Sequence, residues 1–556
     1  MRILILGLCV FFLACMAYGQ KGPEQGFFEL VKSGTPEQVQ AAIDKGANVN
    51  EKNLHTIIDD VPFSSIPQAT DPNNNSDIIK VQLISNQDTY IGKYKNRTVD
   101  YRVGKDYKLY AVVLKSEDKT DYYSRFGWTP LMLAAYFNQN EGIVELLIKN
   151  GADIEYSDRH NMTALMCAAE NNPNPEVINS LLQAGAKVNR SNSAGKTPLM
   201  FASKKNCPEI IMALLIAGAK IDSHAINGWT PVTYAASWNN NPEVLLVLLK
   251  AGAVIDECDK AYMTPLMRAA ENNTNPDVFS ALIKAGANVN RRDYYLKMTP
   301  LMFACEYQQN PDIINVLLQA GAEVEGRDRY GNTPLMHAAG WNSNPKVIEA
   351  LLKAGAKVDD RDEDGKTPLM HASESNVPLP IIAILVASGA RLGDKDAEGI
   401  TPLMLAAKYK YNPNSDTVTY LIKNGIKVDD KDEEGNTALM YAAGSNPNRQ
   451  FITTLINAGS NVNAINNDGM SPLMLAAEYS TNADVISTLL EANADAKLKC
   501  KDPFHYSKYR LLNMQYNDGF DSYFPEVKDY TAFDFAMRNY NINDDVVCWE
   551  LSKLRF

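Results

Sequence analysis

The chain has few of the residues that build metal centres and catalytic sites. Its 556 residues include 8 cysteines, 6 histidines and 5 tryptophans. No two cysteines have the Cys-x-x-Cys spacing of a zinc site, and no segment forms a serine nucleophile elbow or pairs carboxylates for acid–base catalysis. We therefore expect no enzyme activity, and no catalytic, cofactor-binding or metal-binding residues.

Clustered positive charge and long apolar runs are also missing. Lys and Arg number 54 against 66 Asp and Glu, which gives a formal net charge of −12. A nucleic-acid partner requires a cationic surface, so this composition argues against one. No segment has the about 20 consecutive apolar residues of a membrane-spanning helix. We expect no transmembrane segment.

The first residues differ from everything that follows. Arg2 precedes an apolar run that ends at Leu13, and Ala17 and Gly19 are small residues at the positions that signal cleavage requires. Residues 1–19 are therefore predicted to be a signal peptide, cleaved near Gly19. The mature chain would then be extracytoplasmic, either periplasmic or secreted.

The cysteines leave two alternatives open. Cys15, preceded by Ala14, also suits the lipid attachment site of a bacterial lipoprotein, although Met16 suits it less. An exported chain meets oxidising conditions, so Cys500 and Cys548 are a candidate disulfide. The other cysteines are interpreted as small buried apolar residues.

A repeat dominates the rest of the sequence. A Thr or Ser, usually followed by Pro, opens the same phrase eleven times at spacings of 33 to 36 residues: Thr129, Thr163, Thr197, Thr230, Thr264, Thr299, Thr333, Thr367, Thr401, Thr437 and Ser471. Such a period indicates one supersecondary unit that buries its apolar face only against further copies of itself.

One copy shows how each unit folds. Thr333 suits a helix N-cap and Pro334 the first helical position, so a first helix begins there. Asn344 and Pro345 repeat this chemistry for a second helix, which Gly355 ends in the left-handed conformation. An Asp-x-x-Gly turn then leads through an extended arm into the next copy.

This phrase resembles the ankyrin repeat, with its Asp-x-x-Gly-x-Thr-Pro-Leu, Ala-Ala, Val-x-x-Leu-Leu and Gly-Ala segments. The resemblance implies an all-α repeat solenoid, a stack of helix-turn-helix-β-turn units that binds proteins through a concave face. Where the family usually has His after Thr-Pro-Leu, this chain has Met in ten copies and Thr233 in the other. We interpret these methionines as flexible apolar filler rather than a soft-metal ladder.

The repeat also divides the chain. We predict an N-terminal capping repeat at 24–53, a small β-rich insertion at 54–124, eleven ankyrin repeats at 125–500, a second insertion at 501–530 and a C-terminal capping repeat at 531–556. In the first insertion, β-branched and aromatic residues predict strands near 78–84, 98–103 and 107–115.

Positions that the stack does not dictate carry large aromatic residues. The position eight residues after each Thr or Ser is aromatic in six of eleven copies, against 9% of the whole chain. Together with the turns, these positions give the predicted partner-binding residues: Trp128, Phe137, Trp229, Trp238, Tyr307, Tyr330, Trp341, Tyr409 and Tyr479. Exposed aromatic side chains supply binding hot spots. The alternative is that they stack on one another and only shield the groove.

Acidic arms at 359–364, 394–398 and 429–434 are explained either by a solvated surface or by a partner with a basic patch. We predict an exported, monomeric, non-catalytic scaffold for protein–protein interaction that binds its partner through the aromatic concave face. Its near-identical, Asn- and Lys-rich copies suit a bacterial envelope or secreted protein. The alternative is a structural surface spacer whose 54–124 insertion makes the contacts.

Overall fold

The computed structural model describes residues 30–50, 89–94, 97–103, 109–112, 127–375, 377–408, 415–445, 448–500, 530–537, 539 and 546–554. The predicted signal peptide lies outside these residues. The chain divides into two compact units: residues 1–235 with 246–253, and 236–245 with 254–556. They are called unit 1 and unit 2, and each is described by itself.

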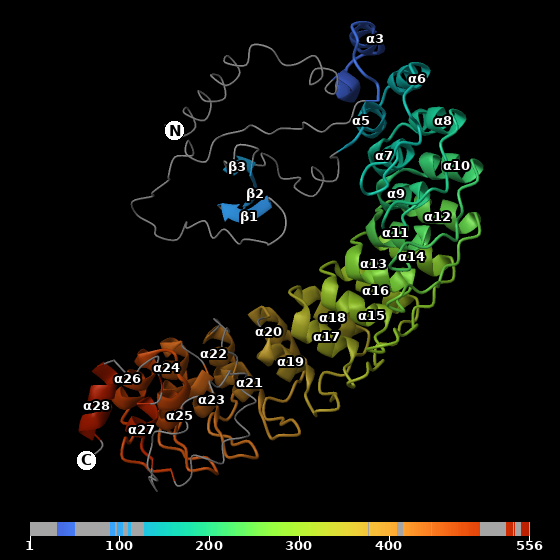
Figure 1. Cartoon of the computed structure of the whole chain (residues 1–556). Helices are drawn as coiled ribbons and strands as arrows, with labels where there is room; N and C mark the ends of the chain where they lie inside the picture. The colour runs from blue at the N-terminus through green and yellow to red at the C-terminus, as the bar shows by residue number, and fades with distance from the viewer. Residues whose placement is uncertain are drawn as a thin grey trace. The chain divides into compact units, whose positions relative to one another are not determined.

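Every copy of the repeat in the described part of the chain contributes two short helices (Figure 1). The first helices are α5 (Pro130–Phe137), α7 (Ala164–Asn171), α9 (Pro198–Lys205), α11 (Pro231–Trp238), α13 (Pro265–Asn272), α15 (Pro300–Tyr307), α17 (Pro334–Trp341), α19 (Pro368–Glu374), α21 (Pro402–Lys408), α23 (Ala438–Ser445) and α25 (Pro472–Tyr479). The second helices are α6 (Glu141–Lys149), α8 (Pro175–Gln183), α10 (Pro208–Ile216), α12 (Pro242–Lys250), α14 (Pro276–Lys284), α16 (Pro311–Gln319), α18 (Pro345–Lys353), α20 (Leu379–Ala387), α22 (Ser415–Lys423), α24 (Arg449–Asn457) and α26 (Ala483–Glu491).

The helices of each unit pack in two layers. In unit 1, α5 contacts α7 and α7 contacts α9, while α6, α8 and α10 form the second row. In unit 2, the first helices from α13 to α25 contact one another in sequence order, and so do the second helices from α14 to α26. Each copy therefore buries its apolar residues against its neighbours, and the predicted helical solenoid is confirmed at this level.

The predicted N-cap role of the repeated Thr or Ser is confirmed in all eleven copies. In each copy its side-chain oxygen accepts a hydrogen bond from the backbone N–H three residues later, at 3.3 to 3.4 Å. The side chain thus satisfies one of the backbone donors that a helix start leaves unpaired.

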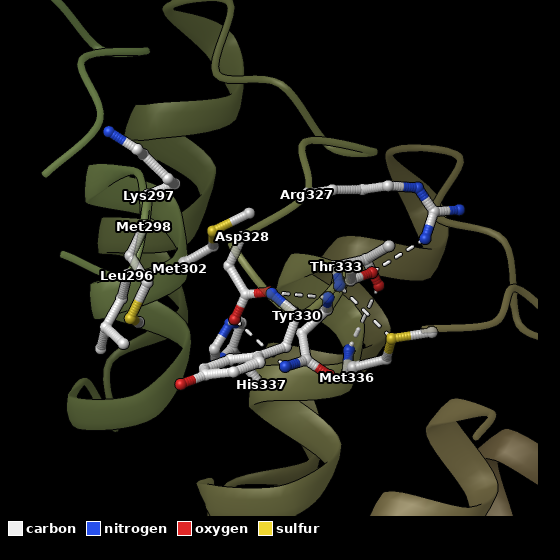
Figure 2. Close-up of polar contacts among 12 residues, drawn as sticks. Leu296, Lys297, Met298, Met302, Arg327, Asp328, Tyr330, Thr333, Met336 and His337 are labelled. Carbon is white, nitrogen blue, oxygen red and sulfur yellow. Dashed lines mark hydrogen bonds and ion pairs between the residues drawn. The ribbon is translucent and has the colours of Figure 1, made fainter. Parts of the chain in front are cut away.

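The methionine that replaces the family histidine has a role beyond filling space. These methionines are buried, and in six copies the thioether sulfur also accepts the N–H of the capping Thr, as Met336 does for Thr333 at 3.3 Å (Figure 2). Sulfur thereby takes the place of the Glu or Gln oxygen in a capping box. The methionine side chain therefore both buries the start of the helix and accepts a hydrogen bond there.

In several copies a buried side-chain amide ties the first helix to the copy before it. The Asn172 side chain donates to the carbonyl oxygens of Ala135 and Asn138, both at 2.8 Å, and Asn342 makes the equivalent pair of bonds in unit 2. Asn206, Asn273 and Gln308 repeat the contact at the same position of their copies. We call this series the amide ladder.

Both ends of the repeat array use the same bond. Asn138 donates to Val31 and Gly34 ahead of α3 (Pro36–Asp44), which contacts α6. Asn539 donates to Ala477 and Ser480, following the short helix α27 (Ala532–Ala536). The last described helix is α28 (Val546–Leu554), which contacts α26 and α27.

The two predicted insertions are described only in part. Strands β1 (Thr89–Tyr94), β2 (Arg97–Val103) and β3 (Leu109–Val112) form an antiparallel sheet in that order. β2 and β3 overlap two predicted strands, the segment 78–84 lies outside the described residues, and β1 was not predicted. A β-rich insertion over the whole of 54–124 stays a prediction.

The second insertion leaves and re-enters the array at one place. Cys500 and Tyr530 form an antiparallel bridge, with N···O distances of 2.9 and 3.1 Å. Residues 501–529 lie outside the described residues, and so does the side chain of Cys548. The disulfide between Cys500 and Cys548 stays a prediction.

The amide ladder gives a stability prediction with a control one residue away. Asn172→Ala leaves two buried carbonyls without a donor, and we expect a loss of about 2 to 4 kcal/mol in the free energy of unfolding. Asn171 is exposed and makes a single longer bond of 3.3 Å to Tyr136, so Asn171→Ala should cost less than about 1 kcal/mol. Urea unfolding followed by circular dichroism measures both. Equal losses would show that the ladder does not hold the copies together.

Candidate protein-binding surface

The tip of most arms is built around an aspartate at the start of its turn. One carboxylate oxygen of Asp328 accepts the backbone N–H groups of Tyr330 and Asn332, both at 2.8 Å, and Asp259 closes its own turn in the same way. Gly331 then adopts a φ of 82°, which glycine tolerates without steric cost. These bonds hold the arm tips in one conformation.

In several of these aspartates the second carboxylate oxygen forms a hydrogen bond or ion pair with a side chain nine residues later. That side chain lies on the first helix of the same copy. Asp259 pairs with Arg268 at 2.7 Å, Asp328 with His337 at 3.1 Å, Asp362 with His371 at 2.8 Å and Asp432 with Tyr441 at 2.6 Å. Because these bonds point into the stack, the aspartates of the turns contribute little negative charge to the surface.

His337 is enclosed between two carboxylates, those of Asp328 (Figure 2) and Glu306. Its Nδ1 lies 2.8 Å from an oxygen of Glu306, and its side chain is 8% exposed. Burial alone would lower the pKa of His337, but the hydrogen bonds and charges of Asp328 and Glu306 outweigh burial and raise this pKa above 6.5. Burial would raise the pKa of Asp328, yet hydrogen bonds from His337 and Asn332 leave it lowered.

Cationic side chains tie successive arms of unit 2 together. Arg327 donates to the carbonyl of Arg361 at 2.7 Å, Arg361 to that of Lys395 at 2.6 Å, Lys395 to that of Lys431 at 2.6 Å, and Lys431 to that of Ile465 at 2.8 Å. Each donor occupies the same position of its copy. The arms are therefore joined side by side, and their tips project together from one edge of unit 2 (Figure 1).

The same cations neutralise part of the acidic arms. Arg327 binds both carboxylate oxygens of Asp360, at 2.7 and 2.8 Å, and Arg361 lies 3.2 Å from Asp394. Glu363, Asp364, Glu398 and Glu433 are exposed. The negative surface is thus concentrated at the tips of three consecutive arms.

The predicted partner-binding aromatic residues lie in different environments. Phe137 in unit 1 and Trp238, Tyr307, Tyr330 and Trp341 in unit 2 have exposed side chains, from 38% for Phe137 to 72% for Trp341. Tyr479 is half-buried, and Tyr409 lies outside the described residues. The exposed members, except Tyr330, occupy the C-terminal end of a first helix, at the position eight residues after the Thr.

Trp128 was wrongly placed on the surface. It is 1% exposed, its indole N–H donates to Asp158 at 3.0 Å, and its ring contacts Tyr136 at a centroid distance of 5.4 Å. The residue before the capping Thr points into the stack, as the buried Met298 does in its copy. Trp128 is a core residue and cannot contact a partner.

Trp229 occupies the equivalent position and is half-buried. Its ring packs on Tyr234 at a centroid distance of 5.1 Å and lies against Met200 and Ala225. Its main contacts are therefore with its own and the preceding copy. The prediction of a fully surface-directed side chain is corrected for this residue as well.

Sequence reasoning missed the polar residues that shape the surface. The amide ladder, the arm aspartates and the cations that join the arms each recur at the repeat period, so their columns were visible in the sequence. The partners of the amides and of the cations are backbone carbonyls of a neighbouring copy, which the sequence does not reveal. The recurrence of Asn nine residues after Thr is the signal that could have drawn attention to the amide ladder.

Two features are absent from the described part of the chain. No group of three or more His, Cys, Asp or Glu side chains among those residues is arranged to hold a metal ion. None of the described helices has both the length and the apolar character needed to cross a membrane.

Comparison with known proteins identifies a family that the chain matches. A model of ankyrin repeats, three copies long, matches overlapping windows at 69–192, 170–259, 199–293, 241–328, 266–362, 301–396, 342–432 and 403–502. The crystal structure of the human ASB11 ankyrin repeat domain is similar, with 27% sequence identity and a TM-score of 0.37 over 41% of this chain and 99% of that chain. Among curated proteins, none matches this chain.

The His337 contacts predict how stability depends on pH. Because folding raises the pKa of His337, its contribution is complete below the unfolded value of about 6.5 and is lost as the pH rises through the higher folded value. The contribution of Asp328, whose pKa is lowered, is lost only as the pH falls below about 4. Between pH 6 and 9, the wild type should therefore lose more thermal stability than His337→Gln, as measured by melting temperature. Parallel curves would contradict this account.

Proposed function

Because the chain belongs to the family of ankyrin-repeat proteins, whose repeats generally mediate protein–protein interaction, we propose that it is a non-catalytic scaffold that binds a protein partner. The proposed binding surface of unit 2 is the row of aromatic side chains at the ends of its first helices. It consists of Trp238 on α11, Tyr307 on α15 and Trp341 on α17, and we call it the aromatic row.

The exposure of the aromatic row is the observation that supports this proposal. The three side chains are between 46% and 72% exposed, and α15 and α17 are direct neighbours. Other copies carry Asn272 or Ser375 at the same position, so the stack does not require an aromatic ring there. Large rings held on a rigid helix end lose little conformational entropy on binding, which makes them effective anchors.

The charge of the partner is part of the proposal. The exposed carboxylates at the arm tips, Glu363, Asp364 and Glu433 among them, would attract basic groups on the region of the partner that covers those arms. Such contacts lie in solvent, so association should weaken as salt concentration rises. We also propose that the chain is exported after cleavage near Gly19 and acts as a monomer.

A second candidate places the contacts on the 54–124 insertion, with the repeats as a spacer. The sheet of β1, β2 and β3 supports it, because this sheet is not part of the helical repeat pattern. Deleting residues 54–124 separates the two ideas. Retained partner capture favours the aromatic row, and lost capture with an unchanged helical signal favours the insertion.

The aromatic row predicts a large loss of binding on truncation. Each aromatic side chain that the partner buries contributes about 2 kcal/mol to the binding free energy, or about thirtyfold in Kd. Replacing Trp238, Tyr307 and Trp341 together with Ala should therefore abolish capture of partners from an extract of the source organism, while circular dichroism keeps its helical signal. The captured proteins would be identified by mass spectrometry and their Kd measured with purified partner.

The matched control removes the same number of exposed apolar side chains elsewhere. Met212 and Ile216 on α10 and Leu246 on α12 are exposed apolar residues of second helices. Their combined replacement by Ala should leave capture unchanged. Capture that persists in the aromatic-row variant would reject the row as the binding surface.

A further inference from the structure

Three arm tips of unit 2 carry exposed tyrosines and cations that neither the stack nor the aromatic row uses. The tips comprise residues 260–262, 294–297 and 329–330. We call their six central side chains the tyrosine patch: Tyr262, Tyr294, Tyr295, Lys297, Arg329 and Tyr330. Its four tyrosines are between 49% and 60% exposed.

Three of the four rings of the patch contact one another. The ring centroid of Tyr262 lies 4.8 Å from that of Tyr294 and 5.9 Å from that of Tyr295, and the last two rings meet edge to face at 5.4 Å. The ammonium of Lys297 lies 5.0 Å from the Tyr294 centroid. These contacts hold the exposed rings in place before any partner binds.

Backbone bonds join the tips that carry the patch. The N–H of Arg329 donates to the carbonyl of Leu296 at 2.7 Å, and its guanidinium reaches the carbonyl of Tyr295 at 3.5 Å. The third and second arms are thereby linked, while the ring contacts link the second to the first. The patch is one surface that spans three arms.

Two members of the patch occupy a position that favours glycine. Tyr262 and Lys297 have φ values of 60° and 61° at the turn position that Gly331 fills in the next copy. A bulky side chain there carries a conformational cost that glycine would avoid. Folding alone therefore does not explain a tyrosine at residue 262, whereas a binding role for its ring does.

The charge of the patch is opposite to that of the chain. The aspartates of these arms face inward: Asp259 pairs with Arg268, Asp328 pairs with His337, and Asp293 is buried and accepts backbone N–H groups of its own turn. The tips themselves contain cations and no Asp or Glu. In a chain of net charge −12, this is a local cationic surface with aromatic rings.

We propose that the tyrosine patch binds an acidic segment of a protein partner, whose carboxylates pair with Lys297 and Arg329 and whose apolar side chains pack among the four rings. This inference rests on the proposed function of protein binding and adds the chemistry of one contact. A single-stranded nucleic acid would also combine negative charge with stacking groups. It is disfavoured because the exposed carboxylates of the next arms, Glu363 and Asp364, would repel a continuous polyanion.

The test measures fluorescence anisotropy of labelled probes with the full chain. The probes are a peptide of repeated Glu-Pro-Leu triplets, the same peptide with Ser or with Lys in place of Glu, and oligothymidylate. We expect the Glu peptide to bind most tightly and to weaken with added salt. Equal binding of the Ser or Lys peptide, or tighter binding of oligothymidylate, would overturn the inference.

Variants locate the site. Replacing both Tyr294 and Tyr295 with Ala should lower the affinity for the Glu peptide about tenfold or more, whereas replacing both with Phe keeps the rings and most of the affinity. Lys297→Glu with Arg329→Glu should reverse the preference toward the Lys peptide. The control, Lys284→Glu with Lys353→Glu, changes the same charge on the exposed ends of α14 and α18 and should bind as the wild type does. A control that loses affinity equally would overturn the assignment.

The aromatic row and the tyrosine patch can be rejected independently of each other. The variant that lacks the aromatic row should bind the Glu peptide as the wild type does. If the Glu peptide shows no preference while partner capture still depends on the aromatic row, the tyrosine patch inference fails and the proposed function stands. If peptide binding depends on the patch but capture does not depend on the aromatic row, the aromatic row fails as the binding surface and the tyrosine patch inference stands.

Discussion

A buried side-chain amide fixes one copy against the copy before it in both units. At this position Asn donates to two carbonyl oxygens that the end of the preceding first helix leaves unpaired, as Asn342 does for Cys305 and Gln308, and Gln308 itself donates to the carbonyl of Ala270. In the apolar interior an unpaired carbonyl is costly, so neighbouring copies have a single favourable alignment. Equivalent positions then line up within each unit, and the exposed columns and joined arms depend on that alignment.

The sequence was sufficient to predict structure where the interacting residues belong to the same short segment. Thr333, Asn344 and Gly355 mark helix starts and ends within one copy, and their neighbours along the chain are enough to show it. It was insufficient where the partner lies one copy away. Asn342 looks like an ordinary polar residue of a turn, because the backbone carbonyls that it meets become adjacent only after stacking.

The tryptophans show the same limit for the candidate surface. Trp128 and Trp341 are the same residue type, yet one is 1% and the other 72% exposed. The residue before the capping Thr or Ser is Met or Ile in five other copies and Lys or Asn in four, which favours an interior position. The residue eight positions after the Thr is Asn, Lys or Ser in others, which indicates a surface. The residues at the same position of the other copies thus predict the environment of a side chain better than its own residue type does.

The amide ladder also has an evolutionary consequence. Its bonds span 34 to 38 residues and always run from a copy to its predecessor. A tandem duplication of one period would therefore supply both the donor and the acceptors that its new neighbours need. Such a lineage can lengthen or shorten its array by whole copies without redesigning any junction, and the span offered to a partner can change in a single genetic event.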